Sequence, residues 1–381
     1  MFYALTFRWL RFSVLCAVAV LPWHNATASE TVACNEGASS DCYFSFRPSG
    51  AEGNLHYYAS RSPAIKESGF APASALIAVH GHSRDANKSF NAALLAVKQA
   101  GANNQVLVVA PLYQINIAEA GKCQTAGVPV AQAGDLLWTC NSWFSGGAAT
   151  HATGQSISSF AAMDALFIEL KQHWPSLKTI TLSGFSAGAQ MVQRYISFAA
   201  LPPQGVALRF VVAAPGTWLY FDPVRPQLLR AGTAADWTQC SGGTNNLGDC
   251  TLDFKPVEDS VCPGSNRWKY GMQDMPRQLL SGTDLPALRS RYAQADVSYL
   301  EGAGDTGEAR GTAYNILDKS CAAQAQGPYR LQRGLAYAEY DRQTLAPAKK
   351  REVIVVPGCA HDVACVFPSA AARATLLGSG Y

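Results

Sequence analysis

Short apolar runs alternate with amphipathic segments along most of the chain. The run SALIAVHG at 74–81 is followed, at 85–101, by apolar residues with helical spacing that end at a glycine. Further strands are predicted at 105–113, 178–184, 206–216, 295–307 and 352–358, and further helices at 156–175, 187–200 and 327–343. Strands that are apolar throughout, separated by helices of this length, favour an α/β fold with a mostly parallel sheet covered on both faces.

Two stretches interrupt this alternation. Residues 114–155 are irregular, and residues 217–290 combine many turn residues with little periodicity. We interpret 217–290 as a lid-like insertion over the top of the sheet, within a single domain spanning 29–381. Several tryptophans in and near these stretches either line a groove for substrate or pack the insertion, and the sequence favours neither. They are Trp138, Trp143, Trp218, Trp237 and Trp268.

The first 28 residues have the features of a secretory signal peptide. Arg8 and Arg11 precede a short apolar run, and Ala26-Thr27-Ala28 forms a small-x-small cleavage site. The apolar run is too short to span a bilayer, and no later stretch is long and apolar enough to do so. The sequence therefore predicts cleavage after Ala28 and a secreted or periplasmic protein without a membrane span.

The cysteines agree with export. The chain has 11 cysteines, of which only Cys16 lies in the signal peptide, so an even number remains for disulfides in an oxidising compartment. Neighbours in sequence are the simplest pairs, and they leave Cys262 and Cys321 to pair over a longer distance. The short-range pairs are Cys34–Cys42, Cys123–Cys140, Cys240–Cys250 and Cys359–Cys365. No C-x-x-C motif is present, so a metal site is not predicted.

The overall charge gives no reason to expect a polyanionic partner. The 381 residues have a formal net charge of +3, only 15% of them are charged, and long blocks of like charge are absent. Binding to nucleic acid is therefore not expected. Motifs for dinucleotides, for nucleotide phosphates and for catalytic zinc are also absent, so no cofactor is expected.

The clearest chemical signal is the sequence Gly184-Phe185-Ser186-Ala187-Gly188, a G-x-S-x-G motif. A predicted strand runs directly into it and a predicted helix starts directly after it. Such a strand–turn–helix is so tight that only small residues fit two positions before and after the serine, and it exposes the serine hydroxyl. Ser186 is therefore the candidate nucleophile.

A serine hydroxyl needs a base, and His361 is the best candidate. It follows the last predicted strand in the loop CAHDVAC, and the carboxyl ends of strands are where open α/β sheets place their chemistry. His151, in the irregular stretch before the motif, is a weaker candidate. We interpret His56 and His173 as surface or packing residues.

The acid that orients the base should lie between Ser186 and His361 in the chain. Asp305 is preferred because a strand ending in a Gly-rich turn presents it at the carboxyl edge of the sheet. Asp222, soon after the strand at 206–216, is the second candidate. Asp362 is expected to cap the turn that follows the histidine.

Two backbone N–H groups are needed to stabilise the oxyanion. Ala187 supplies one at the start of the helix. The loop VHGHSRD after the strand at 74–81 is the natural source of the second, and we select the N–H of His82. His80 is expected to hold this loop through hydrogen bonds rather than to move a proton.

From residue 74 to residue 367 the chain resembles a secreted serine esterase of the α/β-hydrolase superfamily. The resemblance rests on VHGHS, SGFSAG, YLEGAGD and VPGCAHD, in this order. It is similar to polyhydroxyalkanoate-depolymerase-like and feruloyl-esterase-like proteins, and the motifs do not distinguish these two groups. The resemblance implies an α/β-hydrolase fold with the insertion over the active site, a Ser186–Asp305–His361 triad, and hydrolysis of a small-molecule or polymeric ester. A peptidase or amidase with the same triad and a non-catalytic binding protein on this fold are the alternatives.

Overall fold

Eight strands form one sheet in the order β1-β2-β4-β3-β5-β6-β10-β11. Strands β1 and β2 run antiparallel to their neighbours, and all other neighbouring pairs are parallel. The strands are β1 Tyr43–Phe46, β2 Leu55–Ala59, β3 Ser74–Val79, β4 Val106–Leu112, β5 Thr179–Phe185, β6 Ala207–Ala213, β10 Val297–Gly302 and β11 Val353–Val356. All six strands predicted from apolar runs belong to the parallel part of the sheet, which confirms the predicted fold class.

This computed structural model describes residues 1–2, 34–65, 69–123, 127–150, 157–240, 242, 247–280, 282 and 284–378. The predicted signal peptide and its cleavage site lie outside the described residues, apart from the first two. Among the described residues, no helix has both the length and the apolar character needed to cross a membrane.

Helices cover both faces of the sheet. They are α1 Ala86–Gln99, α2 Ile117–Cys123, α3 Ser159–His173, α4 Ala187–Tyr195, α5 Arg277–Leu280, α6 Leu285–Gln294, α7 Cys321–Gln324, α8 Arg330–Tyr340, α9 Val363–Val366 and α10 Ala370–Leu377. Successive side chains of β3 enter different cores, as the period of a strand requires. Ile77 and Val79 pack with residues of α3, α4 and α8, whereas Leu76 and Ala78 pack with residues of α1, α9 and α10. The sheet is therefore buried on both faces, which explains its continuously apolar strands.

Several helix boundaries differ from the prediction by a few residues. The helix expected at 187–200 ends at Tyr195, and the one expected at 327–343 begins at Arg330. Gly327 has a φ of +133°, outside the helical range, so the helix cannot extend back to it. After Tyr340 the chain continues in a π-helical turn, Asp341–Leu345.

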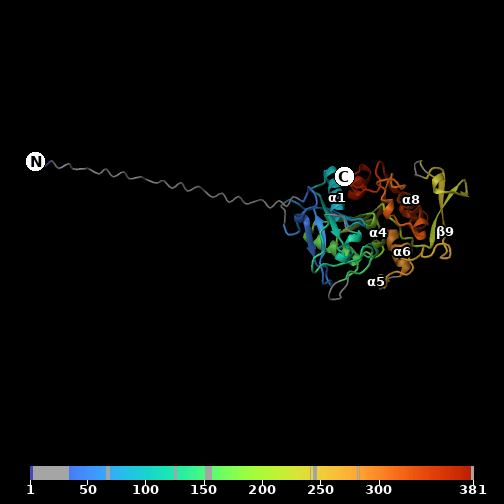
Figure 1. Cartoon of the computed structure of the whole chain (residues 1–381). Coiled ribbons are helices and arrows are strands. Elements are labelled where there is room, and N and C mark those ends of the chain that lie inside the picture. The colour runs from blue at the N-terminus through green and yellow to red at the C-terminus, as the bar shows by residue number, and fades with distance from the viewer. Residues whose placement is uncertain are drawn as a thin grey trace. The chain divides into compact units, whose positions relative to one another are not determined.

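The segment 217–290 is more ordered than its sequence indicates. It contains a three-stranded antiparallel sheet formed by β7 Val224–Arg230, β8 Thr233–Ala234 and β9 Cys250–Pro256. We predicted no strand here, because prolines and charged residues interrupt the apolar pattern of VRPQLLR and CTLDFKP. This small sheet packs against α8, where Leu228 and Leu252 share a core with Ala336 (Figure 1). Among the described residues of the segment, Lys269 is the one that reaches the cavity beside Ser186.

Candidate active site

The turn between β5 and α4 places Ser186 in a backbone conformation that few residues adopt. Its φ is 58° and its ψ is −119°. A Cβ on Gly184 would lie 2.2 Å from the carbonyl oxygen of Gly188, and one on Gly188 would lie 2.4 Å from that of Val79. Larger residues at these two positions would collide with backbone, which is the physical reason for the G-x-S-x-G pattern. The strained turn presents the serine hydroxyl above the sheet.

Three predicted residues come together in one hydrogen-bonded chain. The hydroxyl of Ser186 lies 2.9 Å from Nε2 of His361, and Nδ1 of His361 lies 2.7 Å from Oδ2 of Asp305. With Nδ1 protonated, the imidazole donates to the carboxylate and accepts from the hydroxyl. Asp305 follows β10 and His361 follows β11, and these two strands are neighbours in the sheet. The geometry required for general-base activation of a serine is present.

Arg330, at the start of α8, pairs with the carboxylate oxygen of Asp305 that does not bond to His361. Its Nη1 lies 3.4 Å from Oδ1 of Asp305 and donates to the carbonyl oxygen of Thr312 at 2.6 Å. Both side chains of this ion pair are almost fully buried, at 3% and 2% exposure. Sequence analysis did not identify Arg330, because no local pattern indicates that this arginine meets Asp305.

The environment of His361 favours a neutral imidazole. Burial lowers the pKa of His361, the hydrogen bond to Asp305 opposes this, and the positive charge of Arg330 adds to the lowering. A neutral imidazole is the form that can accept the serine proton. The backbone N–H of His361 donates to the carbonyl oxygen of Gly311 at 3.0 Å, and the imidazole ring packs against the ring of Phe185.

The loop after β3 lies beside Ser186. A Cβ on Gly81 would be 3.7 Å from Cβ of Ser186. His80 is fully buried, hydrogen-bonds the carbonyl oxygen of Gly81 at 2.8 Å and accepts the N–H of Tyr113 at 3.2 Å. Burial lowers the pKa of His80 to about 3, so its ring is neutral and supports the loop, as predicted. His82 and Ala187, the two predicted oxyanion donors, line the same cavity as Ser186.

The other acidic candidates have different partners. The carboxylate of Asp222 accepts from the hydroxyl of Tyr340 at 2.7 Å and from Arg289 at 3.3 Å. Asp362 caps α9 by accepting the N–H of Ala364 at 2.9 Å, as predicted. Neither carboxylate is bonded to His361, which already has Asp305 as its partner.

The remaining histidines have structural partners where they are described. His56 is buried in β2 and lies 2.7 Å from the carboxylate of Asp135. His173 lies 3.0 Å from Glu169, one turn earlier in α3. His151, the weaker candidate for the base, lies outside the described residues.

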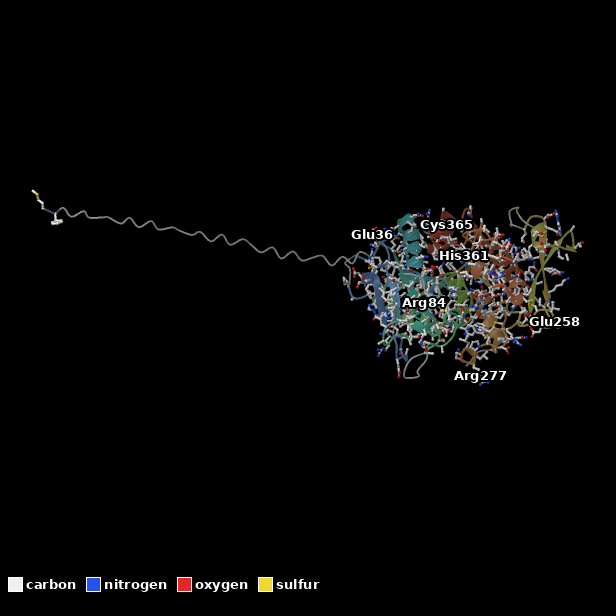
Figure 2. The ribbon with its side chains drawn as sticks, viewed as in Figure 1. Glu36, Arg84, Glu258, Arg277, His361 and Cys365 are labelled. Atoms are coloured by element: carbon white, nitrogen blue, oxygen red, sulfur yellow. A yellow bond between two sulfur atoms is a disulfide. The ribbon has the colours of Figure 1, made fainter. Side chains whose placement is uncertain are left out.

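The ten described cysteines form the five predicted disulfides. The pairs are Cys34–Cys42, Cys123–Cys140, Cys240–Cys250, Cys262–Cys321 and Cys359–Cys365. The last of them closes a small ring that contains His361, and His361 and Cys365 lie close together in Figure 2. Among the described residues, no group of three His, Cys, Asp or Glu side chains is arranged to hold a metal ion.

A small cavity of about 160 Å³ opens beside Ser186. Its walls are mostly polar, and sequence analysis identified only three of the residues that form them. The lining residues are His82, Asn141, Phe144, Ser186, Ala187, Gln190, Gly216, Lys269, Ile316, Asp318 and Arg330. None of the five tryptophans considered above is among them. Trp138, Trp143 and Trp218 are buried, at 2%, 0% and 0% exposure, so they pack the core instead of lining this cavity.

Comparison with solved structures shows that the chain has the α/β-hydrolase fold. Similar structures include poly(aspartic acid) hydrolase-1 from Sphingomonas sp. KT-1, with a TM-score of 0.50 and 18% identity over 84% of this chain and 94% of that one. The poly(3-hydroxybutyrate) depolymerase from Bordetella parapertussis has a TM-score of 0.49 and 17% identity over 84% and 85% of the two chains. No protein-family profile and no curated protein sequence matches the chain. Similarity at this level of identity concerns the fold alone.

Proposed function

We propose that this chain is a serine hydrolase that cleaves carboxylic esters through an acyl-enzyme intermediate. The observation that carries the proposal is the unbroken hydrogen-bonded chain from Ser186 through His361 to Asp305. The strained turn at Ser186 and the buried carboxylate of Asp305 support it. The roles of these residues are those of a nucleophile, a general base and an orienting acid.

The reaction has two halves. In the first, Oγ of Ser186 attacks the ester carbonyl while Nε2 of His361 takes the hydroxyl proton, and Asp305 stabilises the imidazolium that forms. The N–H groups of His82 and Ala187 bind the oxyanion. His361 then protonates the departing alkoxide, which leaves as the alcohol. In the second half, His361 removes a proton from water, the hydroxide attacks the acyl group, and the free acid leaves as Ser186 regains its proton.

The disulfides support a proposal about location and domain organisation. Five disulfides form and persist in oxidising compartments, so we propose that the protein is exported to the periplasm or the medium. We also propose that residues 29–381 act as one catalytic domain. Within it, the segment 217–290 contributes Lys269 to the wall of the cavity beside Ser186.

Hydrolysis of matched substrates tests the proposed function. The purified protein is incubated with ethyl butyrate, with a polyester film and with a peptide anilide, and acid or aniline release is followed. We expect turnover of the ester with a kcat/KM well above that for the anilide, because an alkoxide leaves more readily than an amine. Comparable turnover of the anilide would instead favour an amidase. Turnover of none of them would favour a binding protein.

The pH dependence of ester hydrolysis should reflect the environment of His361. Only the neutral imidazole accepts the serine proton, so kcat/KM should rise as the pH increases through the pKa of this histidine. Because burial lowers that pKa, the acid limb for neutral ethyl butyrate should have its midpoint below the ordinary histidine value of about 6.5. The measurement is kcat/KM from about pH 4 to about pH 8. A midpoint above the ordinary value would contradict this description of the base.

A further inference from the structure

The walls of the cavity beside Ser186 carry more positive than negative charge. Lys269 and Arg330 contribute two cations, whereas Asp318 is the one carboxylate among the lining residues that the structure describes. The ring of His82, also in the wall, adds no charge at neutral pH because burial lowers its pKa. The chain as a whole is nearly neutral, with a net charge of only +3 over 381 residues, whereas the wall of this cavity carries an excess of positive charge.

A buried arginine lies directly behind three of the wall residues. Arg194, in α4, is 0% exposed and donates to the carbonyl oxygens of Phe144 at 2.8 Å and Lys269 at 3.5 Å. It also donates to Oε1 of Gln190 at 3.0 Å. These acceptors are neutral, so they satisfy the N–H groups without cancelling the charge. Burial lowers the pKa of Arg194 to about 9, which leaves the guanidinium protonated at neutral pH.

A second buried arginine bonds to two other residues of the wall. Arg333, in α8, is 0% exposed and donates to the carbonyl oxygens of Gly216 and Asp318. Burial lowers its pKa to about 10, so it too remains charged at neutral pH. Its acceptors here are again backbone carbonyl groups.

The nearby carboxylates do not cancel this charge. Four cations, Lys269, Arg330, Arg194 and Arg333, line the cavity or bond directly to its wall. In the described part of the chain, three carboxylates lie close to these cations: Asp305, Asp318 and Asp85, which accepts the N–H of Gly81. Glu301 is fully buried, and burial together with the neighbouring Asp305 raises its pKa well above the ordinary value, so it is neutral. An excess of positive charge in a half-buried site attracts an anion more strongly than the same charge fully exposed to water.

Lys269 is the cation best placed to meet such an anion. Arg330 is already held by Asp305 and by the carbonyl oxygen of Thr312. The ammonium of Lys269 lies 3.5 Å from Oδ2 of Asp318. This contact uses at most one of the three hydrogen-bond donors of the lysine. Asp318 is itself engaged by the hydroxyl of Tyr270 and by the N–H of Ser320. A second acceptor can therefore approach Lys269 without displacing Asp318.

The size of the cavity limits what it can take. A volume of about 160 Å³ is close to that of a cavity known to hold one benzene molecule. It suits a group of a few carbon atoms. Phe144 and Ile316 provide the apolar side chains of the wall.

We propose that the preferred substrates are short esters that carry a carboxylate a few bonds from the scissile carbonyl, and that Lys269 binds this carboxylate. The inference rests on the proposed esterase function and deepens it by naming the substrate class. A charge-assisted hydrogen bond formed in a half-buried site is strong enough to produce a clear preference over an uncharged group of the same size.

The test compares esters that differ only in the terminal group. Monoethyl succinate and ethyl butyrate form the pair for the acyl side, and 3-acetoxypropanoate and propyl acetate form the pair for the alcohol side. We expect kcat/KM to be about tenfold or more higher for the anionic member of at least one pair. The cationic ethyl ester of 4-(trimethylammonio)butyrate should react more slowly than ethyl butyrate. The preference for the anion should shrink as NaCl is raised from about 0.05 M to about 0.5 M.

Variants at position 269 identify the residue responsible. Lys269→Met should reduce the anionic-to-neutral ratio of kcat/KM by about tenfold, mainly through KM, whereas Lys269→Arg should retain most of it. Lys255→Met is the matched control, because Lys255 lies in β9, is exposed and pairs with Asp253. It should leave the ratio unchanged.

Failure of this inference can be distinguished from failure of the proposed function. If neutral esters are hydrolysed but neither anionic ester is preferred, the substrate class is wrong and the esterase function stands. A full preference in Lys269→Met would overturn the role of Lys269. Hydrolysis of no ester at all would contradict the proposed function itself. If Lys269→Met does not fold, the salt dependence and the cationic ester still decide the question on the unmodified protein.

Discussion

Ser186→Ala is expected to abolish covalent labelling by a fluorophosphonate and to remove almost all ester hydrolysis. The hydroxyl is the only group in the hydrogen-bonded chain that can form the acyl-enzyme, so its loss should lower kcat by on the order of 10⁶-fold. A small residual rate should remain, because the backbone N–H groups of the oxyanion site are still present. The measurements are intact-protein mass after labelling, peptide mapping of the label, and ester turnover.

A neighbouring serine is the control for this experiment. Ser183 lies in β5, just before the turn at Ser186, and its hydroxyl donates to the carbonyl oxygen of Ile77 at 2.8 Å. Ser183→Ala should therefore still be labelled once, at Ser186. Labelling of Ser186→Ala at another serine, or activity close to that of the unmodified protein, would refute the proposed nucleophile.

Asp305→Asn should lower kcat by about 10³- to 10⁴-fold. The carboxylate accepts the Nδ1 proton of His361 at 2.7 Å and thereby holds the tautomer in which Nε2 can accept the serine proton. An amide that presents its NH₂ group to Nδ1 stabilises the opposite tautomer. The variant leaves the side-chain volume nearly unchanged but also weakens the buried ion pair with Arg330, so its melting temperature should be recorded beside kcat.

Asp222→Asn provides the matched comparison. Asp222 is also an aspartate that follows a strand of the main sheet, but it bonds to Tyr340 and Arg289 and not to the base. Its replacement should change stability more than it changes kcat. If Asp222→Asn proves the more damaging of the two, the assignment of the acid to Asp305 is wrong.

The parts of this fold that the sequence predicted are encoded locally. A strand buried on both faces needs a run of apolar residues, and β3, β4 and β5 show such runs directly. The G-x-S-x-G motif identifies the turn at Ser186 because the collision of a Cβ with backbone is also local. The disulfides between cysteines that are close in sequence are also encoded locally. A short loop brings the two cysteines together whatever the position of the segment in the fold.

The strands that the prediction missed have a different kind of environment. β1 and β2 are short antiparallel strands at one end of the sheet, and β7 and β9 form a separate small sheet on α8. β1, β7 and β9 are only partly buried, and the buried strand β2 contains His56, so none of them shows a continuous apolar run. The tryptophans present the same difficulty, because composition alone does not separate a side chain that packs the core from one that lines a groove.

Which acid meets the base was a question of tertiary structure. Asp305 and Asp222 both lie between Ser186 and His361 in the chain and both follow a strand. The order of the sheet places β10 beside β11, so Asp305 meets His361, whereas Asp222 turns towards Tyr340 of α8.

The charge of the cavity was likewise decided by the packing of distant segments. By composition the chain is close to neutral. Helices α4 and α8 nevertheless place Arg194 and Arg333 behind the wall of the cavity. Arg330 and Lys269 reach the wall from separate segments. Local patterns determined which residues can do chemistry. The order of the strands and the packing of the helices decided which of them meet, because contacts between distant segments depend on the whole fold.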